Sequence, residues 1–503
     1  MEGCRMSAAA QSRGSQGPSG MSEHAYLVFF VTSLALLMAS VDGTIVNVGL
    51  RTMQSELNTN IALLGWTLTG YTLTQTIAMP LAGKLSDEWG RKRLFLGAVV
   101  IFTLSSAAAG LAPNVHLLIV FRVFQAIGGG AFLPSATGIV SDAFGDKRGT
   151  AIGLFTSIFP LGGIIGPNLG GFLLDHTTWR WIFYVNVPIG ILLLVLGVFV
   201  LPNTKIVSNV KRSVDVMGAS YFAASMLGVL YGMTELANNP NATSDPMMWA
   251  SFGTGLVMLV LFLRHETRTP APMIELELLK WRPFAAANAY NFLYGVAAFG
   301  LFSFIPYYAS YAYNMTPGES GLILTPRSIA MATLSTVSSF FLIRVGYRKP
   351  MILGALVVAL SLILMSQGWH DITLFGWHVP NLMLLGAITT ISGLGVGIGG
   401  PASNNASLDL VPEKVAAVAG LRGMFRSTGG TLGTALITLY LSHQTDAGVG
   451  LQHIFVILAV VLVATIPIVF LIPERGQIPA GRPVDTTSPS GARPVMDVVE
   501  VGE

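Results

Sequence analysis

Long apolar segments separated by short polar loops make up most of this sequence. Each segment runs for roughly 17 to 25 residues, the length that an α-helix needs to cross the hydrocarbon core of a bilayer. Only 11% of the residues are charged, whereas a soluble domain carries about 25%. The pattern therefore predicts an all-α polytopic membrane protein. The fourteen predicted transmembrane spans cover residues 26–49, 61–82, 94–112, 116–140, 150–173, 180–201, 216–237, 249–264, 284–308, 319–343, 350–367, 380–401, 414–442 and 451–472.

Basic residues concentrate on one side of this topology. The tails and the even-numbered loops hold 22 of the 28 Lys and Arg residues, whereas the odd-numbered loops hold only Arg51 and Arg180. The short segment 249–264 counts as a span because omitting it would move the basic residues after it to the other side. By the positive-inside rule, both termini are predicted to be cytoplasmic, in the plasma or inner membrane of a cell. The net charge of +3 reflects this bias, and no nucleic-acid partner is expected.

The two ends of the chain are polar and rich in small residues. Residues 1–24 are rich in Gly and Ser, and residues 474–503 are rich in Pro, Gly, Ser and Thr, so both are predicted to be disordered cytoplasmic tails. Met21 is a second candidate start. The one cysteine, Cys4, lies in the first tail. The sequence therefore predicts no disulfide and no metal site built on cysteine.

The sequence repeats two motifs at an offset of eight spans. The loop 83–93 after the second span has a shorter counterpart, 344–349, after the tenth. The glycine-rich segment 128–134 in the fourth span has a counterpart, 397–401, in the twelfth. An offset of eight arises when two spans are inserted between six-helix halves. The predicted organisation is a six-helix bundle at 25–203, a linker with two extra helices at 204–275 and a second six-helix bundle at 276–473.

Five motifs resemble those of the major facilitator superfamily, and in particular its fourteen-helix drug:proton antiporter branch of multidrug exporters. They are the loop 83–93, Arg122-x-x-Gln125-x-x-Gly128, and the segments 41–48, 162–171 and 426–433. The resemblance implies a secondary transporter, not an enzyme, that exports small hydrophobic or amphipathic compounds in exchange for protons by alternating access. It implies the proton gradient as the energy source and no cofactor. The expected partners are the lipid bilayer, a small-molecule substrate and protons, and the chain is expected to be a monomer.

Asp42 in the first span is the candidate proton carrier. An ionised carboxylate inside a membrane costs at least about 2.5 to 3.5 kcal/mol, so Asp42 is expected to face a wet cavity or to be protonated much of the time. The alternative is a packing role in which Asp42 bonds to Thr44 or Asn47. Arg122, on one helix face with Gln125, is expected to stabilise ionised Asp42 or to hold substrate. Its alternative role is structural, bonded to backbone carbonyls.

The candidate substrate-cavity residues are Asn47, Gln125 and Arg327. Arg327 lies in the tenth span with no acidic residue nearby in the sequence. Two roles are open for it: it lines the path of anionic or amphipathic cargo, or it pairs with carbonyl groups freed by Pro326. A further pair of span residues, Arg422 and Arg426, is expected to stabilise the cytoplasmic half of the thirteenth span.

Two segments are candidate gating elements. The loop containing Gly83, Asp87, Gly90 and Arg91 is by itself a turn with surface charge, which is usually solvated. By resemblance, Asp87 and Arg91 form a charge lock between helices, which Asp142, Asp146, Lys147 and Arg148 in the next loop could join. In the fifth span, a stripe of small residues permits close helix packing and a bend, and the resemblance implies that it seals the cytoplasmic side. This stripe includes Gly163, Gly166, Pro167, Gly170 and Gly171.

Three other functional classes compete with an exporter. An uptake symporter is the nearest, and the stripe around Gly166 and Pro167 argues against it. A membrane-embedded enzyme would need a cluster of nucleophile and base, and the sequence has no Walker A, HExxH or GxSxG pattern. A signalling receptor would need an output domain outside the membrane, for which the tails are too short.

The topology gives a first testable prediction. With Cys4 replaced by Ser, Asn239→Cys and Thr316→Cys should each react with a membrane-impermeant maleimide added to intact cells. Ser208→Cys should react only after permeabilisation, because its loop is predicted to be cytoplasmic. Labelling of Thr316→Cys from the inside alone would show that the chain has fewer than fourteen spans.

Overall fold

The structure is a computed structural model, and it describes most of the chain between the tails. The described residues are 23–144, 151–152, 154–155, 158–202, 215–239, 241–269, 272, 274, 276–299, 302–374, 377–411 and 415–474. Within them, the side chains of residues 84, 87, 88, 159, 160, 299, 343, 374, 377 and 415–417 are outside the description. Residues 1–22 and 475–503, which make up nearly all of the predicted tails, lie outside it too.

The first six predicted spans coincide with helices, which we call the N-terminal half. Its elements are α1 (Glu23–Ile45), η1 (Val46–Gly49), α2 (Leu50–Glu56), α3 (Ile61–Leu64), α4 (Trp66–Trp89), α5 (Arg91–Gly110), α6 (Val115–Phe144), α8 (Phe159–His176), α9 (Trp181–Tyr184) and α10 (Asn186–Val200). Two helices joined by a short turn follow, α11 (Val216–Asn238), η3 (Ala242–Ser244) and α12 (Pro246–Glu266). We call these two helices the insert.

The remaining helices form the C-terminal half. Its elements are α13 (Leu276–Lys280), α14 (Arg282–Tyr294), the π-helical turn η4 (Gly295–Phe299), α16 (Ile305–Ala312), α17 (Pro317–Leu322), α18 (Leu324–Val345), α19 (Arg348–Ser366), α20 (Asn381–Leu410), α21 (Val415–Ser442), α22 (Ala447–Ala464) and α23 (Ile466–Val469). Between α19 and α20, the two-residue strands β1 (Thr373–Leu374) and β2 (Trp377–His378) pair antiparallel. The sequence analysis did not predict this small hairpin.

Nine helices within the described residues are long and apolar enough to cross a membrane. One of them is α12, with 21 residues, so the doubtful segment 249–264 is confirmed as a helix of spanning length. Three predicted ends were wrong. The first span continues beyond residue 49 to Glu56, the second continues beyond residue 82 to Trp89, and the twelfth continues through Pro401 to Leu410. Residues 83–89, which were predicted to be part of a turn, are therefore helical. Neighbouring helices and local adjustments can accommodate a proline inside a membrane helix, so Pro401 is a poor stop signal.

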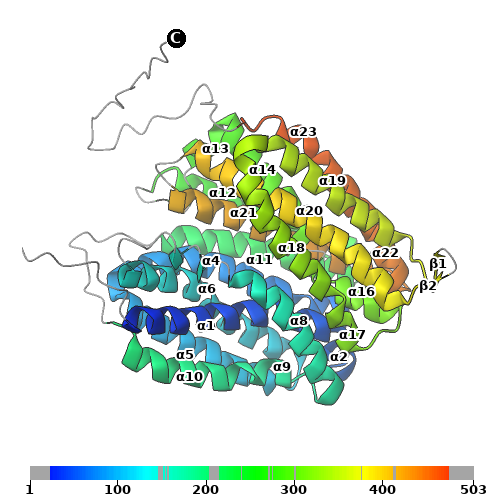
Figure 1. The fold of residues 1–503 in the computed structure, drawn as a ribbon, viewed down its shortest axis with the longest axis horizontal. Coiled ribbons are helices and arrows are strands. Elements are labelled where there is room, and N and C mark those ends of the chain that lie inside the picture. Colours follow the sequence, from blue (N-terminus) through cyan, green and yellow to red (C-terminus); the bar gives the residue numbers. More distant parts are fainter. Residues whose placement is uncertain are drawn as a thin grey trace, which may run out of the picture.

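The helices form two bundles that meet at one end of the molecule (Figure 1). We call that end, which carries β1 and β2, the hairpin end. The opposite end carries Arg91, Arg264 and Arg348, and we call it the basic end. Within the halves, α5 packs on α6 and α18 on α20, while α21 contacts α4 and α11 across the boundary. Toward the basic end, the ribbons of the two halves diverge (Figure 1).

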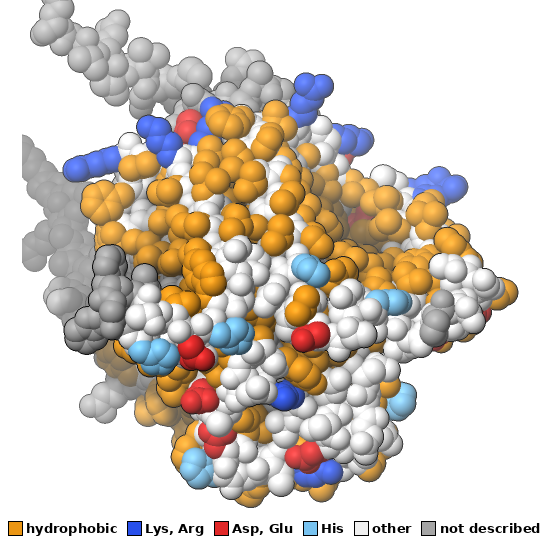
Figure 2. Space-filling view, turned by 90° about the vertical axis from the view of Figure 1, so that its right-hand side faces the viewer, with side chains coloured by type: hydrophobic (Ala, Val, Ile, Leu, Met, Phe, Trp, Pro, Cys, Tyr) orange, Lys and Arg blue, Asp and Glu red, His pale blue; other side chains and the backbone are white. Residues whose placement is uncertain are grey.

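The surface shows both the lipid-facing and the polar parts of the molecule. Figure 2 looks onto the hairpin end, where acidic and histidine side chains gather, while most of the Lys and Arg in view lie at the upper edge. Large apolar side chains point outward on the helix flanks, and Phe199 and Phe340 are 81% and 76% exposed. Lipid tails would cover such side chains.

Two glycines make the turns that follow α4 and α18. Gly90 ends α4 and begins α5 with φ of 91°, and Gly346 ends α18 with φ of 78°. A side chain at such positive φ values is strained, so glycine is the residue that fits both turns. These turns occupy the repeated loops 83–93 and 344–349, so the repeated motif preserves a backbone shape as well as charge.

Gly90→Ala should destabilise the protein by about 1 to 3 kcal/mol, because alanine would hold an unfavourable backbone conformation. The measurement is thermal unfolding of the purified protein in detergent. Gly97→Ala is the matched control, since Gly97 lies inside α5 with nothing within 4 Å of an added Cβ, and helix propensity alone should leave that variant as stable or more stable. Equal melting temperatures for both variants would contradict the assignment of strain to Gly90.

Candidate functional site

Asp42 lies at the centre of a buried polar cluster in the N-terminal half. Its Oδ2 accepts a hydrogen bond from Arg122 Nη1 at 2.6 Å. Its Oδ1 accepts two more, from Gln125 Nε2 and Asn186 Nδ2, each at 2.8 Å. The exposed fraction of Asp42 is 0% and that of Arg122 is 1%. One carboxylate therefore accepts hydrogen bonds from three donors, one of which is a cation.

The other members of the cluster hold these groups in place. Ser106 Oγ accepts from Gln125 and Asn186 and donates to the carbonyl oxygen of Phe183 at 2.9 Å. Arg122 also donates to Gln125 Oε1 at 2.8 Å. We refer to Asp42, Ser106, Arg122, Gln125 and Asn186 as the aspartate cluster. Its side chains come from α1, α5, α6 and α10, so four helices must be correctly placed to build it.

The guanidinium of Arg122 is also enclosed on its remaining sides. Its Nε donates to the carbonyl oxygen of Thr67 at 3.3 Å, and its Cζ lies 3.8 Å from the ring centre of Tyr71. The ring face carries negative charge that stabilises a cation. Both proposed roles of Arg122 are thus present together, since it pairs with Asp42 and bonds a backbone carbonyl.

The surroundings of Asp42 match part of the expectation. The carboxylate is fully buried among side-chain donors, and Arg122 supplies the expected counter-charge. The packing alternative named the wrong partners. Thr44 donates to the carbonyl oxygens of Ser40, Val41 and Gly162, and the buried Asn47 Oδ1 has no hydrogen-bond partner.

Sequence reasoning missed Ser106, Asn186 and Tyr71. A buried Ser or Asn in a membrane helix gives a weak signal by itself, because such residues also serve as general packing contacts between helices. Gln125 was assigned to the substrate cavity, but it is fully buried within the cluster.

Arg91 of the candidate gating loop bridges two helix ends. Its Nη1 lies 2.6 Å from Asp142 Oδ1 and 2.6 Å from the carbonyl oxygen of Gly138, both on α6. Asp142, one of the acids that could join the predicted lock, is therefore a partner of Arg91. The side chain of Asp87 lies outside the described residues, so the predicted Asp87 to Arg91 contact stays a prediction. Gly83 lies against Pro134 of α6, with 3.8 Å between an added Cβ and Pro134 Cβ.

The C-terminal half repeats this bridge with different residues. The Tyr347 hydroxyl bonds Asp409 near the end of α20, the helix that corresponds to α6. The backbone N–H of Tyr347 donates to Glu474 at 2.9 Å. The second loop is thus shorter in sequence but still ties α19 to α20.

The small residues of α8 serve two different neighbours. Gly166 and Gly170 lie against Thr44 and Ile45 of α1, where an added Cβ would collide. Gly171 lies against Gly318 of α17 instead. One face of α8 therefore packs on α1 of its own half, and the adjacent face packs on α17 of the other half. Its contacts with α17 lie toward the hairpin end, whereas the resemblance implied a seal at the other end.

Among the described residues, the further hydrogen bonds between the halves lie at the hairpin end and near the middle of the helices. Arg51 donates to the carbonyl oxygen of Ser310 and lies 4.5 Å from the ring centre of Tyr311. Gln54 Oε1 accepts from Tyr307 at 2.9 Å. These contacts close the hairpin end.

Deeper between the halves, three hydrogen bonds join α8 to α17 and α18. They are Gly318 N to Asp175 Oδ2 at 3.1 Å, Asn168 Nδ2 to Thr325 Oγ1 at 2.6 Å and Ser328 Oγ to the carbonyl oxygen of Gly163 at 3.0 Å. From Ser328 toward the basic end, the described residues show no further hydrogen bond between the halves.

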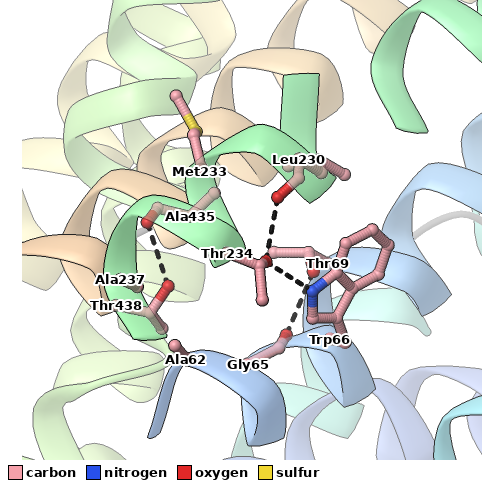
Figure 3. A pocket seen from close by; sticks show the side chains of 10 residues that line it. All are labelled: Ala62, Gly65, Trp66, Thr69, Leu230, Met233, Thr234, Ala237, Ala435 and Thr438. Carbon is pink, nitrogen blue, oxygen red and sulfur yellow. Dashed lines mark hydrogen bonds between the residues drawn. The ribbon is translucent and has the colours of Figure 1, made fainter. Parts of the chain in front are cut away.

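The boundary between α4, α11 and α21 is also filled. Trp66 Nε1 donates to Thr234 Oγ1 at 2.7 Å (Figure 3), and the cavity among these helices measures only about 10 Å³. That is room for no more than a water molecule. A larger cavity of about 470 Å³ opens at the hairpin end beside Gln54, Tyr307 and Tyr311.

Comparison with known proteins decides the family. The family model described as Major Facilitator Superfamily matches residues 32–287 and again 288–497. The chain belongs to the Major Facilitator Superfamily. It is therefore a membrane transporter and not an enzyme, and the predicted family and fold class are confirmed.

Two bacterial relatives cover most of this facilitator. It is 31% identical over 455 residues to the multidrug resistance protein B homolog of Mycobacterium tuberculosis, covering 90% of this chain and 80% of the relative. It is 32% identical over 416 residues to multidrug resistance protein 3 of Bacillus subtilis, covering 82% and 78%. Among solved structures, it resembles an inward-facing bacterial homolog of the human lysosomal transporter Spinster, with TM-score 0.63, 16% identity and coverage of 90% and 98%. That likeness shows the fold.

The buried ion pair of this facilitator gives a stability prediction. Arg122→Gln should lower the free energy of unfolding by about 3 to 5 kcal/mol, because it leaves a buried carboxylate without its cation. The double variant Asp42→Asn with Arg122→Gln should regain most of that loss, since neither group is then charged. Thermal unfolding in detergent measures both. If the double variant were less stable than Arg122→Gln, electrostatic pairing would not be the reason for the loss.

Proposed function

We propose that this facilitator exports small hydrophobic or amphipathic compounds in exchange for protons, with Asp42 as the proton carrier. The observation that carries the proposal is the aspartate cluster, a fully buried carboxylate paired to the cation of Arg122. Intramembrane acids are costly and commonly serve proton relays. The two relatives named multidrug resistance proteins support the export of drug-like compounds.

Protonation of Asp42 would change the balance of the cluster. A neutral carboxyl attracts Arg122 more weakly, and it offers a donor where the three existing partners are donors. Hydrogen bonds from Arg122, Gln125 and Asn186 would therefore weaken or rearrange.

The helix that carries Asp42 offers a route from the proton to the gate. Two residues along α1, Thr44 donates to the carbonyl oxygen of Gly162 at 2.9 Å, which ties α1 to α8. The opposite face of α8 bonds Thr325 and Ser328 of the other half. A shift of α1 on protonation would therefore act on a helix that lies at the boundary between the halves.

Alternating access would use the contacts that differ between the two ends. The hairpin end is closed by Arg51, Gln54 and Asp175 with their partners. Opening it requires these bonds to break while new contacts form at the basic end, which the positive-inside rule places in the cytoplasm. Rocking of the halves about a central site satisfies both requirements.

Asp42→Asn should abolish transport driven by a pH gradient, because asparagine cannot exchange a proton. The assay is uptake of a panel of anionic, uncharged and cationic dyes into inverted vesicles acidified inside, which reports export. Asp42→Glu should retain part of the activity. Asp371→Asn is the matched control, since Asp371 lies exposed beside the β hairpin and should transport as the unmodified protein does.

Two further results would contradict the proposal. Unchanged pH-driven transport in Asp42→Asn would remove the role of Asp42 in coupling. Transport in the opposite direction, so that acidified inverted vesicles lose substrate, would favour an uptake symporter. The double variant Asp42→Asn with Arg122→Gln controls for folding, because it should be stable yet inactive.

A further inference from the structure

The C-terminal half contains half-buried cations without the acidic partner that the N-terminal half provides. Arg122 is paired with Asp42, but Arg327 and Arg422 have no carboxylate within salt-bridge distance among the described residues. The sequence explains why. Between residues 282 and 442, the acidic residues are Glu319, Asp371, Asp409 and Glu413. Of these, the described Glu319, Asp371 and Asp409 lie near the ends of helices or in a loop.

Three arginines within the spans of this half interact with the last turn of α14. Arg422 bonds Asn291, and Arg426, one turn further along α21, lies within electrostatic range of Arg422 and of Tyr294. Arg327, on α18, lies within electrostatic range of the same Tyr294. Direct packing confirms the closeness of α14 and α21, since an added Cβ on Gly295 would collide with the backbone of Arg426.

Several polar atoms in this region have unused hydrogen-bonding capacity. Arg327 Nε, Arg422 Nε and the Tyr294 hydroxyl are buried without a hydrogen-bond partner. Arg422 Nη1 makes one long hydrogen bond, 3.4 Å to Asn291 Oδ1, and the guanidinium of Arg327 lies 3.5 Å from the ring centre of Phe302. Donors of this kind are unfavourable unless water or a ligand satisfies them.

The region is only partly buried. Arg327 and residues 422–428 of α21 are half-buried, whereas the next turn toward the hairpin end is buried. Nothing lies within 4 Å of an added Cβ at Gly420 or Gly423. Both α18 and α21 contact the N-terminal half, through α8 and through α4. The arginines therefore lie on two helices of this half that border the other half.

We propose that Arg327 and Arg422, with Tyr294 as a neighbouring donor, form a binding site for an anionic group of the cargo, such as a carboxylate or sulfonate carried on an aromatic or aliphatic body. A guanidinium binds such oxyanions with paired donors, and aromatic side chains bind the apolar body. A cationic compound would be repelled. The inference rests on the proposed function, because it assigns the cargo of the same transporter.

An equilibrium binding experiment tests this site separately from transport. The probes are 1-anilinonaphthalene-8-sulfonate and N-phenyl-1-naphthylamine, which share their rings and differ in the sulfonate. Binding to the purified full-length transporter in phosphatidylcholine nanodiscs is followed by fluorescence. Arg327→Gln and Arg422→Gln should each weaken binding of the sulfonate at least about tenfold, the effect of losing a hydrogen bond to a charged group. Binding of the uncharged probe should change less than about twofold.

Matched variants separate a binding role from a structural one. Arg327→Lys keeps the charge and should restore part of the affinity for the sulfonate. Arg264→Gln removes an exposed arginine at the end of α12 and should leave both probes unaffected. Equal loss of both probes in Arg327→Gln and Arg422→Gln, or no loss of either, would overturn the proposal.

A second lipid composition identifies the source of the anion. In nanodiscs containing phosphatidylglycerol, a lipid headgroup that occupies the site would compete with the sulfonate in the unmodified protein. Loss of sulfonate selectivity in that lipid alone would assign the site to a headgroup, which would overturn its assignment to cargo. Unchanged selectivity supports cargo. The binding measurement needs no proton gradient, so a negative result would not affect the proposal that Asp42 carries the proton. Conversely, loss of transport in Asp42→Asn would not affect the proposal of an anion site.

Discussion

The buried ion pair between Asp42 and Arg122 constrains the rest of the N-terminal half. Removing a carboxylate or a guanidinium from water costs several kcal/mol, and the pair is tolerable only when geometry and neighbouring hydrogen bonds compensate. Gln125, Asn186 and Ser106 supply that compensation. The groups come from four helices, so separating any of those helices would expose the charge to an apolar environment. Large motions are therefore easier between the halves than within this one.

The interface between the halves is built to allow such motion. On α8, Gly166 and Gly170 pack closely against α1, while Gly171 and its neighbours meet the other half through small residues and a few hydrogen bonds. Small residues permit close approach without interlocking long side chains. The contacts that close the hairpin end are polar and few, and their loss can be offset by water when that end opens.

The sequence was sufficient to predict the helices but not their surroundings. Continuous apolar runs and charge bias predict spans because the bilayer imposes a length and a polarity on each one. The same information placed Asp42 and Arg122 together only as a hypothesis, and it missed Asn186 and Ser106. Those two residues are single polar positions in different helices, and only the packing of the helices shows that they share a partner.

Helix ends were predicted less well for a related reason. The twelfth span was ended at Pro401, yet α20 continues for nine residues beyond it. Proline stops a helix in water because it lacks an N–H donor, but inside a packed bundle neighbouring groups can compensate. The π-helical turn η4 and the separate helix α17 were likewise hidden, since a local change in hydrogen bonding leaves the apolar pattern intact.

The location of the two proposed functional groups limits how proton and cargo could be coupled. The acid lies in the N-terminal half, whereas Arg327 and Arg422 lie in the C-terminal half, so one group cannot exchange the proton for the cargo directly. Coupling must then act through the equilibrium between conformations, and each ligand shifts it only by its difference in affinity between the two states. Linkage makes the effect reciprocal: if proton release favours the state that binds cargo at the basic end, bound cargo must favour proton release to the same degree.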